Sequence, residues 1–142
     1  MPLPFHVFCE AEAPSLFERS DGTFQRMEQG KLPPFIAGHR YLLVESSLAQ
    51  FLQALQVERV SFEPAVIFDP SSGETCRSHT RVRIGQLFHV SEVRDLALDG
   101  CRLLTLNDRY PFVSPALKAK LEHGPFPYLQ FSEGLSSFAG AT

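Results

Sequence analysis

The sequence predicts a single α+β domain with a mixed β-sheet, two similar β-α-β units and a central antiparallel hairpin. Three observations lead to this prediction. The chain has 142 residues, the length of one domain with one core. Two stretches, 41–68 and 110–131, each show the pattern of a strand, a short helix and a strand. Between them, a turn-rich loop precedes an alternating strand, as in an antiparallel hairpin.

The composition is that of a globular protein with a weakly acidic charge balance. Apolar residues make up 44% of the chain, too many for a disordered protein, and thirteen Phe with no Trp predict a Phe-rich core. The formal net charge is −3. Because nucleic-acid-binding proteins present a basic face, we expect no nucleic-acid partner. An acidic patch directed at a basic protein partner is compatible with this balance.

The cysteines and the first residues predict a soluble, cytoplasmic protein. Cys9, Cys76 and Cys101 are too few and too widely spaced for a disulfide framework, so we expect reduced thiols. Met1–His6 lacks the basic and apolar regions of a signal peptide. No apolar run approaches the roughly 18 residues of a membrane helix, so we expect no membrane partner.

Residues 1–38 predict an irregular N-terminal arm. Phe5–Glu10 is apolar enough to form a first strand. The following residues, 11–34, have mixed polarity and support at most one short helix. The Pro33-Pro34 pair separates this arm from the first regular unit.

The first unit spans Tyr41–Phe68. Tyr41–Val44 has the apolar character of a buried strand. Ser46 or Ser47 is the expected N-cap of the helix that follows, and Ser47 has Gln50 three residues later, the spacing of a capping box. The spacing of the apolar residues in this helix places four of them on one face: Leu48, Phe51, Leu52 and Leu55.

The central hairpin joins Val60–Phe68 to Arg81–Val90 through the turn-rich loop Asp69–Glu74. Pro64 has no backbone N–H, which places the first of these strands at a sheet edge or at a bulge. The second strand alternates and should be antiparallel to the first. We expect Val82, Ile84 and Phe88 to point inward and Arg81, Arg83 and His89 outward.

The segment after the hairpin has two interpretations. Ser91 could cap one helical turn within Ser91–Asp99, or Val93–Leu98 could continue as extended chain. Cys101–Leu106 is apolar and predicts another strand.

The second unit spans Tyr110–Phe131. Ser114 followed by Pro115 is the typical start of a helix, predicted here over Ala116–His123. A final strand is predicted over Tyr128–Phe131.

The two units match at a constant offset of 69 residues without a gap. Shared apolar positions are expected for any two β-α-β units, and they are also what a duplicated unit would show, so both explanations remain open. The matched pairs are Tyr41 and Tyr110, Val44 and Val113, Leu48 and Leu117, Leu52 and Leu121, Val60 and Leu129, and Phe62 and Phe131.

The matched phrases also carry a resemblance. The first combines Val44, a following Ser and two Leu with Val60-Ser61-Phe62, and the second runs from Phe112 to Leu121 and ends at Leu129-Gln130-Phe131. Over Tyr41–Phe68 and Leu103–Glu133, the chain resembles bacterial immunity proteins from polymorphic-toxin and type VI secretion loci. The resemblance implies a non-enzymatic protein that binds a cognate toxin and blocks it. Some members carry zinc-type Cys-x-x-Cys pairs, which this chain lacks, so it implies no metal site here.

The sequence offers little for catalysis or metal binding. Cys76 and His79 have a Cys-x2-His spacing, but two ligands do not make a structural zinc site, and we expect both to be partly exposed at the start of a strand. The local signatures of cysteine proteases and the Gly-x-Ser-x-Gly elbow are absent. We therefore expect no catalytic residue, no metal and no cofactor.

Charged and aromatic residues between the units form the candidate toxin-binding surface. An acidic inhibitor associates faster with a basic toxin, and nuclease toxins are basic because they bind phosphate groups. Tyr and Arg are frequent in binding hot spots, which adds one residue of each type. The candidates are Asp69, Glu74, Glu92, Asp95, Asp99, Asp108, Arg109 and Tyr110.

These features predict an immunity protein that neutralises a cognate bacterial toxin, such as a nuclease, by occluding its active site. The expected functional surface lies within Asp69–Tyr110. One alternative is an adaptor or chaperone-like domain that binds a secreted effector. Another is a small enzyme that depends on Cys76, His79 and Cys101.

Overall fold

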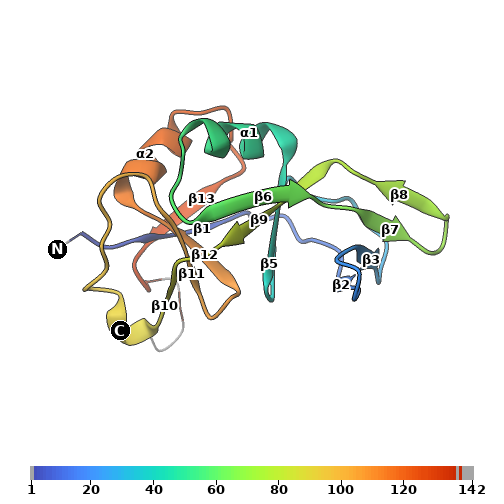
Figure 1. Ribbon diagram of the computed structural model, residues 1–142, viewed down its shortest axis with the longest axis horizontal. Coiled ribbons are helices and arrows are strands. Elements are labelled where there is room, and N and C mark those ends of the chain that lie inside the picture. The colour runs from blue at the N-terminus through green and yellow to red at the C-terminus, as the bar shows by residue number, and fades with distance from the viewer. Residues whose placement is uncertain (1, 137, 139–142) are drawn as a thin grey trace.

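The computed structural model describes residues 2–136 and 138. It is one small α+β domain with mixed sheets and two helices, in which strands predominate (Figure 1). The sheets are called A, B and C below.

Sheet A has five strands in the order β10-β11-β12-β1-β13. The β10–β11 pair is parallel, and the other neighbours are antiparallel. Its strands are β1 (Phe5–Phe8), β10 (Leu87–Phe88), β11 (Leu103–Leu106), β12 (Tyr110–Val113) and β13 (Gln130–Glu133).

Sheet C has four strands in the order β4-β5-β9-β6, all antiparallel to their neighbours. Sheet B has the order β2-β3-β7-β8 and contains one parallel pair, β3–β7. The strands of sheet C are β4 (Phe35–Gly38), β5 (Tyr41–Glu45), β6 (Val60–Pro64) and β9 (His79–Ile84). The strands of sheet B are β2 (Leu16–Glu18), β3 (Phe24–Arg26), β7 (Ile67–Asp69) and β8 (Glu74–Cys76).

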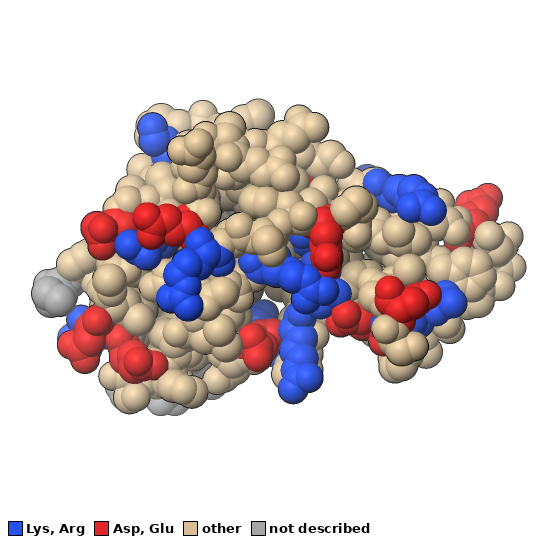
Figure 2. Space-filling model, viewed as in Figure 1, with Lys and Arg blue, Asp and Glu red and all other residues tan. Residues whose placement is uncertain are grey.

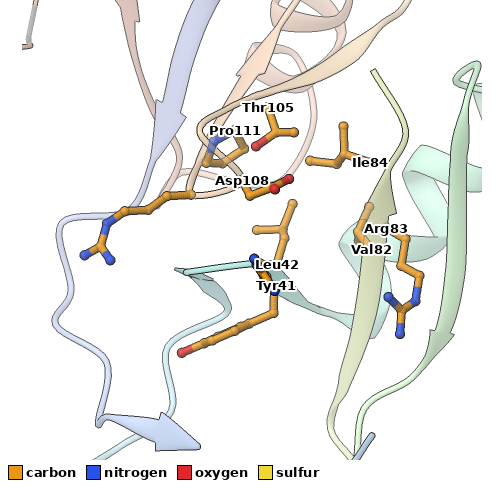
Figure 3. Close-up of a pocket in the computed structure, with 10 residues that line it drawn as sticks. Tyr41, Leu42, Val82, Arg83, Ile84, Thr105, Asp108 and Pro111 are labelled. Carbon is orange, nitrogen blue, oxygen red and sulfur yellow. The ribbon is translucent and has the colours of Figure 1, made fainter. Parts of the chain in front are cut away.

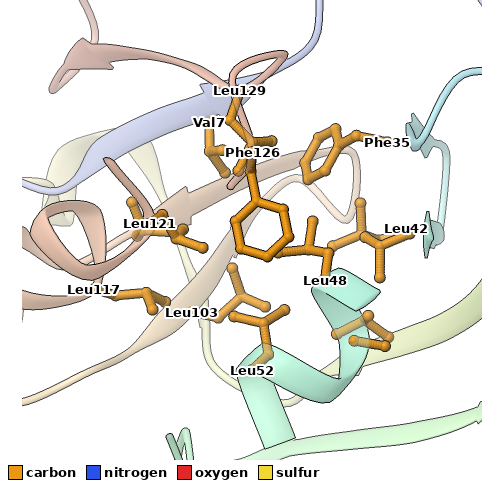
Figure 4. Close-up of a cluster of buried hydrophobic side chains, with 14 of the residues drawn as sticks. Val7, Phe35, Leu42, Leu48, Leu52, Leu103, Leu117, Leu121, Phe126 and Leu129 are labelled. Atoms are coloured by element: carbon orange, nitrogen blue, oxygen red, sulfur yellow. The ribbon is translucent and has the colours of Figure 1, made fainter. Parts of the chain in front are cut away.

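The helices α1 (Ser46–Ala54) and α2 (Pro115–Glu122) lie together on one side of the molecule, over sheets C and A (Figure 1). Their apolar faces close one shared cluster of buried side chains (Figure 4). Leu48 and Leu52 come from α1, and Leu117 and Leu121 from α2. A single core therefore lies beneath both helices.

Sheet C is covered on both faces. Leu42 and Val44 of β5 face the shared cluster beneath the helices. Leu43, between them, packs in a second cluster with Phe24 of β3 and Ile67 of β7. Because successive side chains of a strand point to opposite faces, an apolar run is what a strand buried on both sides requires.

Each strand-helix-strand segment encloses a strand from elsewhere in the chain. The strands β5 and β6 both pair antiparallel with β9, which lies between them. The strands β12 and β13 both pair antiparallel with β1 in the same manner. Sheet A is therefore completed by β1 from the N-terminal half of the chain, and sheet C by β9 from the C-terminal half.

The prediction of an irregular arm over residues 1–38 is wrong, although the first strand within it is confirmed as β1. Four strands, β1–β4, lie in this region, and β1 sits inside sheet A. Three-residue strands such as β2 and β3 are too short to show a period, and their pairing partners include β7, far along the chain.

The central hairpin is confirmed only in part. The predicted strand Val60–Phe68 ends at Pro64, on the edge strand β6, and the chain then enters sheet B as β7. The predicted strand Arg81–Val90 divides into β9 and β10 around Gly85. The pairing of β6 with β9 is antiparallel as expected, and the loop Asp69–Glu74 joins the antiparallel strands β7 and β8.

The outward position predicted for Arg81 is wrong, because its side chain is only 4% exposed. Arg81 lies on the face of sheet C that sheet B covers, opposite Leu43 in the strand pairing. Its guanidinium group lies 5.3 Å from the centre of the Phe24 ring. A polar-apolar alternation predicts one solvated face, and it fails when a second sheet covers that face.

The helix boundaries are close to the predicted ones, but the caps differ between α1 and α2. The second helix begins after Ser114 with Pro115 in its first turn, as predicted. The capping box at Ser47 is wrong, because α1 begins at Ser46 and its N-cap is Glu45. The Ser47 hydroxyl instead donates to the Glu45 carboxylate.

Two further boundaries differ from the prediction. The segment after β10 forms one short 3-10 turn, η1 (Val90–Glu92), whose N-cap is His89 and not Ser91. The last strand is shifted from Tyr128–Phe131 to β13. Among the described residues, no helix combines the length and apolar character needed to cross a membrane.

Candidate binding site at the hairpin tips

The structure distributes the eight predicted site residues over separate regions. Asp69 and Glu74 lie in the β7–β8 hairpin at one end of the molecule (Figure 1). Glu92 and Asp95 lie in and after η1 at the opposite end. Asp99 lies in the loop before β11. The remaining three, Asp108, Arg109 and Tyr110, are consecutive at the β11–β12 turn in the middle. These eight residues therefore do not form one contiguous acidic surface.

Three of the outlying carboxylates have local partners. Glu92 accepts a hydrogen bond from the His89 backbone N–H at 2.8 Å. Asp99 pairs with Arg102 at 3.6 Å. The Ser71 hydroxyl donates to Asp69 at 2.7 Å, and this hydrogen bond holds the Asp69 pKa below its usual value. These interactions order turns, which explains acidic residues there without a partner protein.

Two hairpin tips meet in the middle of the molecule. The β4–β5 hairpin closes between Gly38 and Tyr41, and its turn places Arg40 at a positive φ of 68°. The β11–β12 hairpin has a loop that is one residue longer, with Asp108 at a φ of 54°. The Arg40 N–H donates to the Asp108 carbonyl oxygen at 2.6 Å, which fixes one turn against the other.

A hollow of about 230 Å³ lies beside the joined tips (Figure 3). Asp108 and Thr105 line it from the β11–β12 hairpin, and Val82 and Ile84 line it from β9. The Tyr41 ring projects from the start of β5 at its lower rim in this view. The hollow therefore has one polar wall and one apolar wall.

An ion pair between the buried Arg81 and the exposed Glu18 anchors this region to sheet B. Arg81 donates to both carboxylate oxygens of Glu18 at 2.6 and 3.2 Å and to the Arg40 carbonyl oxygen at 3.0 Å. The Arg81 hydrogen bond is the main reason that the Glu18 pKa is lowered. The guanidinium group thus connects β2, β9 and the β4–β5 tip, and bidentate pairing gives this connection a defined geometry.

Two other arginines remain available for a partner. Arg40 and Arg109 are exposed, and neither forms an ion pair within the described residues. Arg109 lies 5.7 Å from the centre of the Tyr110 ring. Figure 2 shows basic side chains in the middle of this face, with acidic side chains beside them, near the lower end of β5 in Figure 1. We call Arg40, Tyr41, Arg109 and Tyr110 the tip surface.

Aromatic rings support the tip surface from behind. The His6 ring stacks on Phe8 at 5.0 Å and meets the edge of Tyr110 at 5.9 Å. Burial lowers the His6 pKa to about 4, so this ring is neutral at pH 7. A neutral aromatic support holds Tyr110 in place without adding charge.

Cys76 and His79 form local contacts within the fold. His79 is 6% exposed, so the expected exposure of this residue is wrong. Its Nε2–H donates to the Pro33 carbonyl oxygen at 2.8 Å, which leaves Nδ1 to accept from the Ser78 hydroxyl at 2.8 Å. Ser78 is also 3.1 Å from the Cys76 sulfur.

The third member of that proposed enzyme site lies elsewhere. Cys101 packs against the cluster beneath the helices, whereas Cys76 packs against the cluster between sheets B and C. Neither Cys76 nor His79 lines the hollow at the tips. Throughout residues 2–136 and 138, no three His, Cys, Asp or Glu side chains gather as a metal site would require.

Sequence reasoning found one half of the tip surface and missed the other. Arg109 and Tyr110 were predicted, and Arg40 and Tyr41 were not. The signal was present, because the offset of 69 residues that pairs Tyr41 with Tyr110 also pairs Arg40 with Arg109. A surface formed by equivalent turns could therefore have been inferred from the internal match.

The side chains of the tip surface are of types that can bind another molecule. Guanidinium groups bind carboxylates with defined geometry, and Tyr provides a large contact area with a polar end. Both types are frequent among the residues that dominate protein–protein affinity. Comparison with protein-family models, with curated proteins and with solved structures finds no match to this chain.

Proposed function

We propose that this protein is an immunity protein of the bacterial cytoplasm, which binds a cognate toxin and blocks it stoichiometrically by covering its active site. The observation that carries this proposal is the joining of two turns by the Arg40–Asp108 hydrogen bond, beside a hollow of about 230 Å³. This junction brings together two exposed arginines, Arg40 and Arg109, and two half-buried tyrosines, Tyr41 and Tyr110. Such residues are the usual anchors of tight protein complexes.

The charge of this surface refines the kind of contact. The chain as a whole has a net charge of −3, which favours the approach of a basic toxin. At the tips, Arg40 and Arg109 are exposed and form no ion pair among the described residues. We therefore propose that the overall field attracts a basic toxin such as a nuclease, while carboxylates of that toxin contact the arginines at close range.

The decisive experiment mixes the purified protein with the toxin encoded beside it. We expect toxin activity to fall in proportion to the added protein and to vanish near equimolar amounts, because each immunity protein blocks one toxin. A toxin that keeps full activity at molar excess of the protein contradicts the proposal. An adaptor or chaperone would instead bind the effector and leave its activity intact.

We also propose that the two strand-helix-strand segments are copies of one unit. The elements β5 and β12, α1 and α2, and β6 and β13 follow each other at nearly the same offset. Matched positions such as Leu48 and Leu117 are buried in the same cluster. In this interpretation, β1 and β9 are the first strands of the two copies, and each completes the sheet of the other copy.

Fragments test this arrangement. A cut in the exposed β7–β8 loop gives residues 1–72 and 73–142, and each fragment lacks the strand that completes its main sheet. We expect neither fragment to fold alone and the mixture to regain cooperative unfolding. Independent folding of each fragment, measured by circular dichroism during heating, would contradict the exchange of strands.

A further inference from the structure

The edge strand β4 has an open side next to the tip surface. It ends the order of sheet C, and no other strand of the described chain pairs with its free side. An open edge carries a row of backbone donors and acceptors that another extended chain can use.

The strand pairing shows which backbone groups face that open side. The Glu45 N–H donates to the Pro34 carbonyl oxygen at 2.8 Å, which makes this a hydrogen-bonded pair. Hydrogen-bonded and non-hydrogen-bonded pairs alternate in an antiparallel ladder. Phe35 opposite Val44, and Ala37 opposite Leu42, are therefore non-hydrogen-bonded pairs. The N–H and C=O groups of Phe35 and Ala37 point away from β5.

Two hollows follow this open edge. One is about 240 Å³ and includes Phe8 and Tyr110 among its walls. The other is about 450 Å³ and includes Phe17 and His39. Both are also lined by Ala13, Ile36, Ala37 and Arg109, so they adjoin along β4. We call these two adjoining hollows the edge groove.

The charge in the edge groove indicates what would fit. Arg109 lines both hollows, is exposed, and forms no ion pair within the described residues. The Glu18 carboxylate in the larger hollow is already bound by Arg81. An incoming chain therefore meets walls of mixed polarity and, in Arg109, a positive charge without an ion pair among the described residues. An acidic side chain opposite Arg109 complements that charge.

We propose that the partner inserts an extended segment along β4 as an added strand, with an acidic side chain of that segment paired to Arg109. This inference rests on the proposed function, because it takes the cognate toxin to be the partner. β4 has four residues, so the added strand needs about four residues at ~3.3 Å each. Backbone hydrogen bonds to Phe35 and Ala37 provide affinity, and Arg109 selects the acidic position.

Amide hydrogen exchange tests the added strand directly, with the toxin encoded beside this protein as the probe. In the complex, we expect the amides of Phe35 and Ala37 to become strongly protected, since strand addition places both in new hydrogen bonds. A complex that leaves both amides exchanging as in the free protein overturns this inference and leaves the proposed function intact. Failure of the wild-type protein to form any complex overturns both.

Substitutions provide a second measurement. Arg109→Glu should weaken toxin binding at least tenfold, whereas Arg94→Glu, an equal charge change beyond η1, should leave it within about twofold. Ala37→Pro removes the outward N–H and should cost about tenfold, while Ala37→Gly keeps that N–H and most of the affinity. Equal binding by Arg109→Glu and Arg94→Glu would overturn the pairing with Arg109.

Other occupants of the groove would be recognised in the same experiments. Protection of Phe35 and Ala37 in the free protein that increases with its concentration would identify a second copy of this chain on β4. That result, together with dimerisation in analytical ultracentrifugation, would overturn the assignment of the groove to the toxin.

Discussion

The same hairpin strands contribute to two different regions of this molecule. One is the buried cluster beneath the helices, called the helix side, and the other is the surface at the hairpin tips, called the tip side. In β5, Leu42 and Val44 are buried beneath the helices, whereas Tyr41 at the start of the same strand lies at the rim of the tip hollow. Beneath the helices, buried apolar side chains from both helices and from sheets A and C pack in one cluster. At the tips, exposed arginines lack ion pairs among the described residues. This contrast indicates that one side stabilises the fold and the other is available for binding.

The largest effect is expected from truncating a core residue on the helix side. Leu117→Ala should lower the free energy of unfolding by about 2–5 kcal/mol, because the Leu117 side chain is completely buried in the cluster beneath the helices. Urea unfolding followed by circular dichroism measures this change. Leu48→Ala is the matched variant in α1 and should have a similar effect. A loss below about 1 kcal/mol in either would show that the helix side is loosely packed.

The next effect concerns a polar residue on the helix side. The buried Ser114 hydroxyl accepts from the Arg102 N–H at 2.9 Å, accepts from the Leu117 N–H at 3.4 Å and donates to the Gly100 carbonyl oxygen at 2.7 Å. Ser114→Ala removes the partner of these partly buried groups and should destabilise the protein by about 2–3 kcal/mol.

Ser47→Ala serves as the control for that prediction. Ser47 is exposed, and its hydroxyl donates an exposed hydrogen bond to the Glu45 carboxylate two residues before it in the chain, so its loss should change stability by no more than about 0.5 kcal/mol. Thermal unfolding of both variants measures the difference. Equal melting temperatures would show that the two helix starts are equivalent despite their different hydrogen bonds.

The helices show what local sequence can predict. Ser114-Pro115 specifies a helix start by itself, because the cap and the proline act within one turn, and α2 begins there. At α1, three nearby polar residues, Glu45, Ser46 and Ser47, compete for the same role. Capping-box spacing alone favoured the wrong one.

The strands and the site depend on contacts that local sequence does not contain. The run Val60–Phe68 has a continuous strand pattern, yet it serves two sheets because Pro64 ends one pairing and β3 supplies the next. The sequence pattern around Arg81 is that of an exposed residue, but in the structure sheet B covers Arg81 and Glu18 of that sheet pairs with it. The tip surface requires two turns to meet, and only the internal match at 69 residues hinted at this.

An intermediate effect should appear on acidification, at the border between the two sides. Arg81 holds the folded-state pKa of Glu18 below its unfolded value, so Glu18 contributes stability above its usual pKa of about 4.5, and this contribution is lost as the pH falls through the lowered folded-state value. Because Glu18 is largely exposed, solvent screening limits the contribution to about 1 kcal/mol.

Glu18→Gln tests that contribution by unfolding at pH 7 and at pH 3. The variant should be less stable than the wild type at pH 7 and should lose less stability between the two pH values. Glu12→Gln, an exposed change outside this ion pair, should follow the wild-type profile. If Glu18→Gln and the wild type showed the same stability at both pH values, the ion pair would not contribute to stability.

The smallest effect on stability is expected at the tips. Arg109→Ala should change the free energy of unfolding by no more than about 0.5 kcal/mol, because Arg109 is exposed and its ring contact with Tyr110 is 5.7 Å long. The same substitution should weaken toxin binding at least tenfold in calorimetry. If Arg109→Ala instead destabilises the protein as much as Ser114→Ala does, the tips belong to the folding core. The division between a stabilising side and a binding side then fails, because loss of binding would follow from loss of structure.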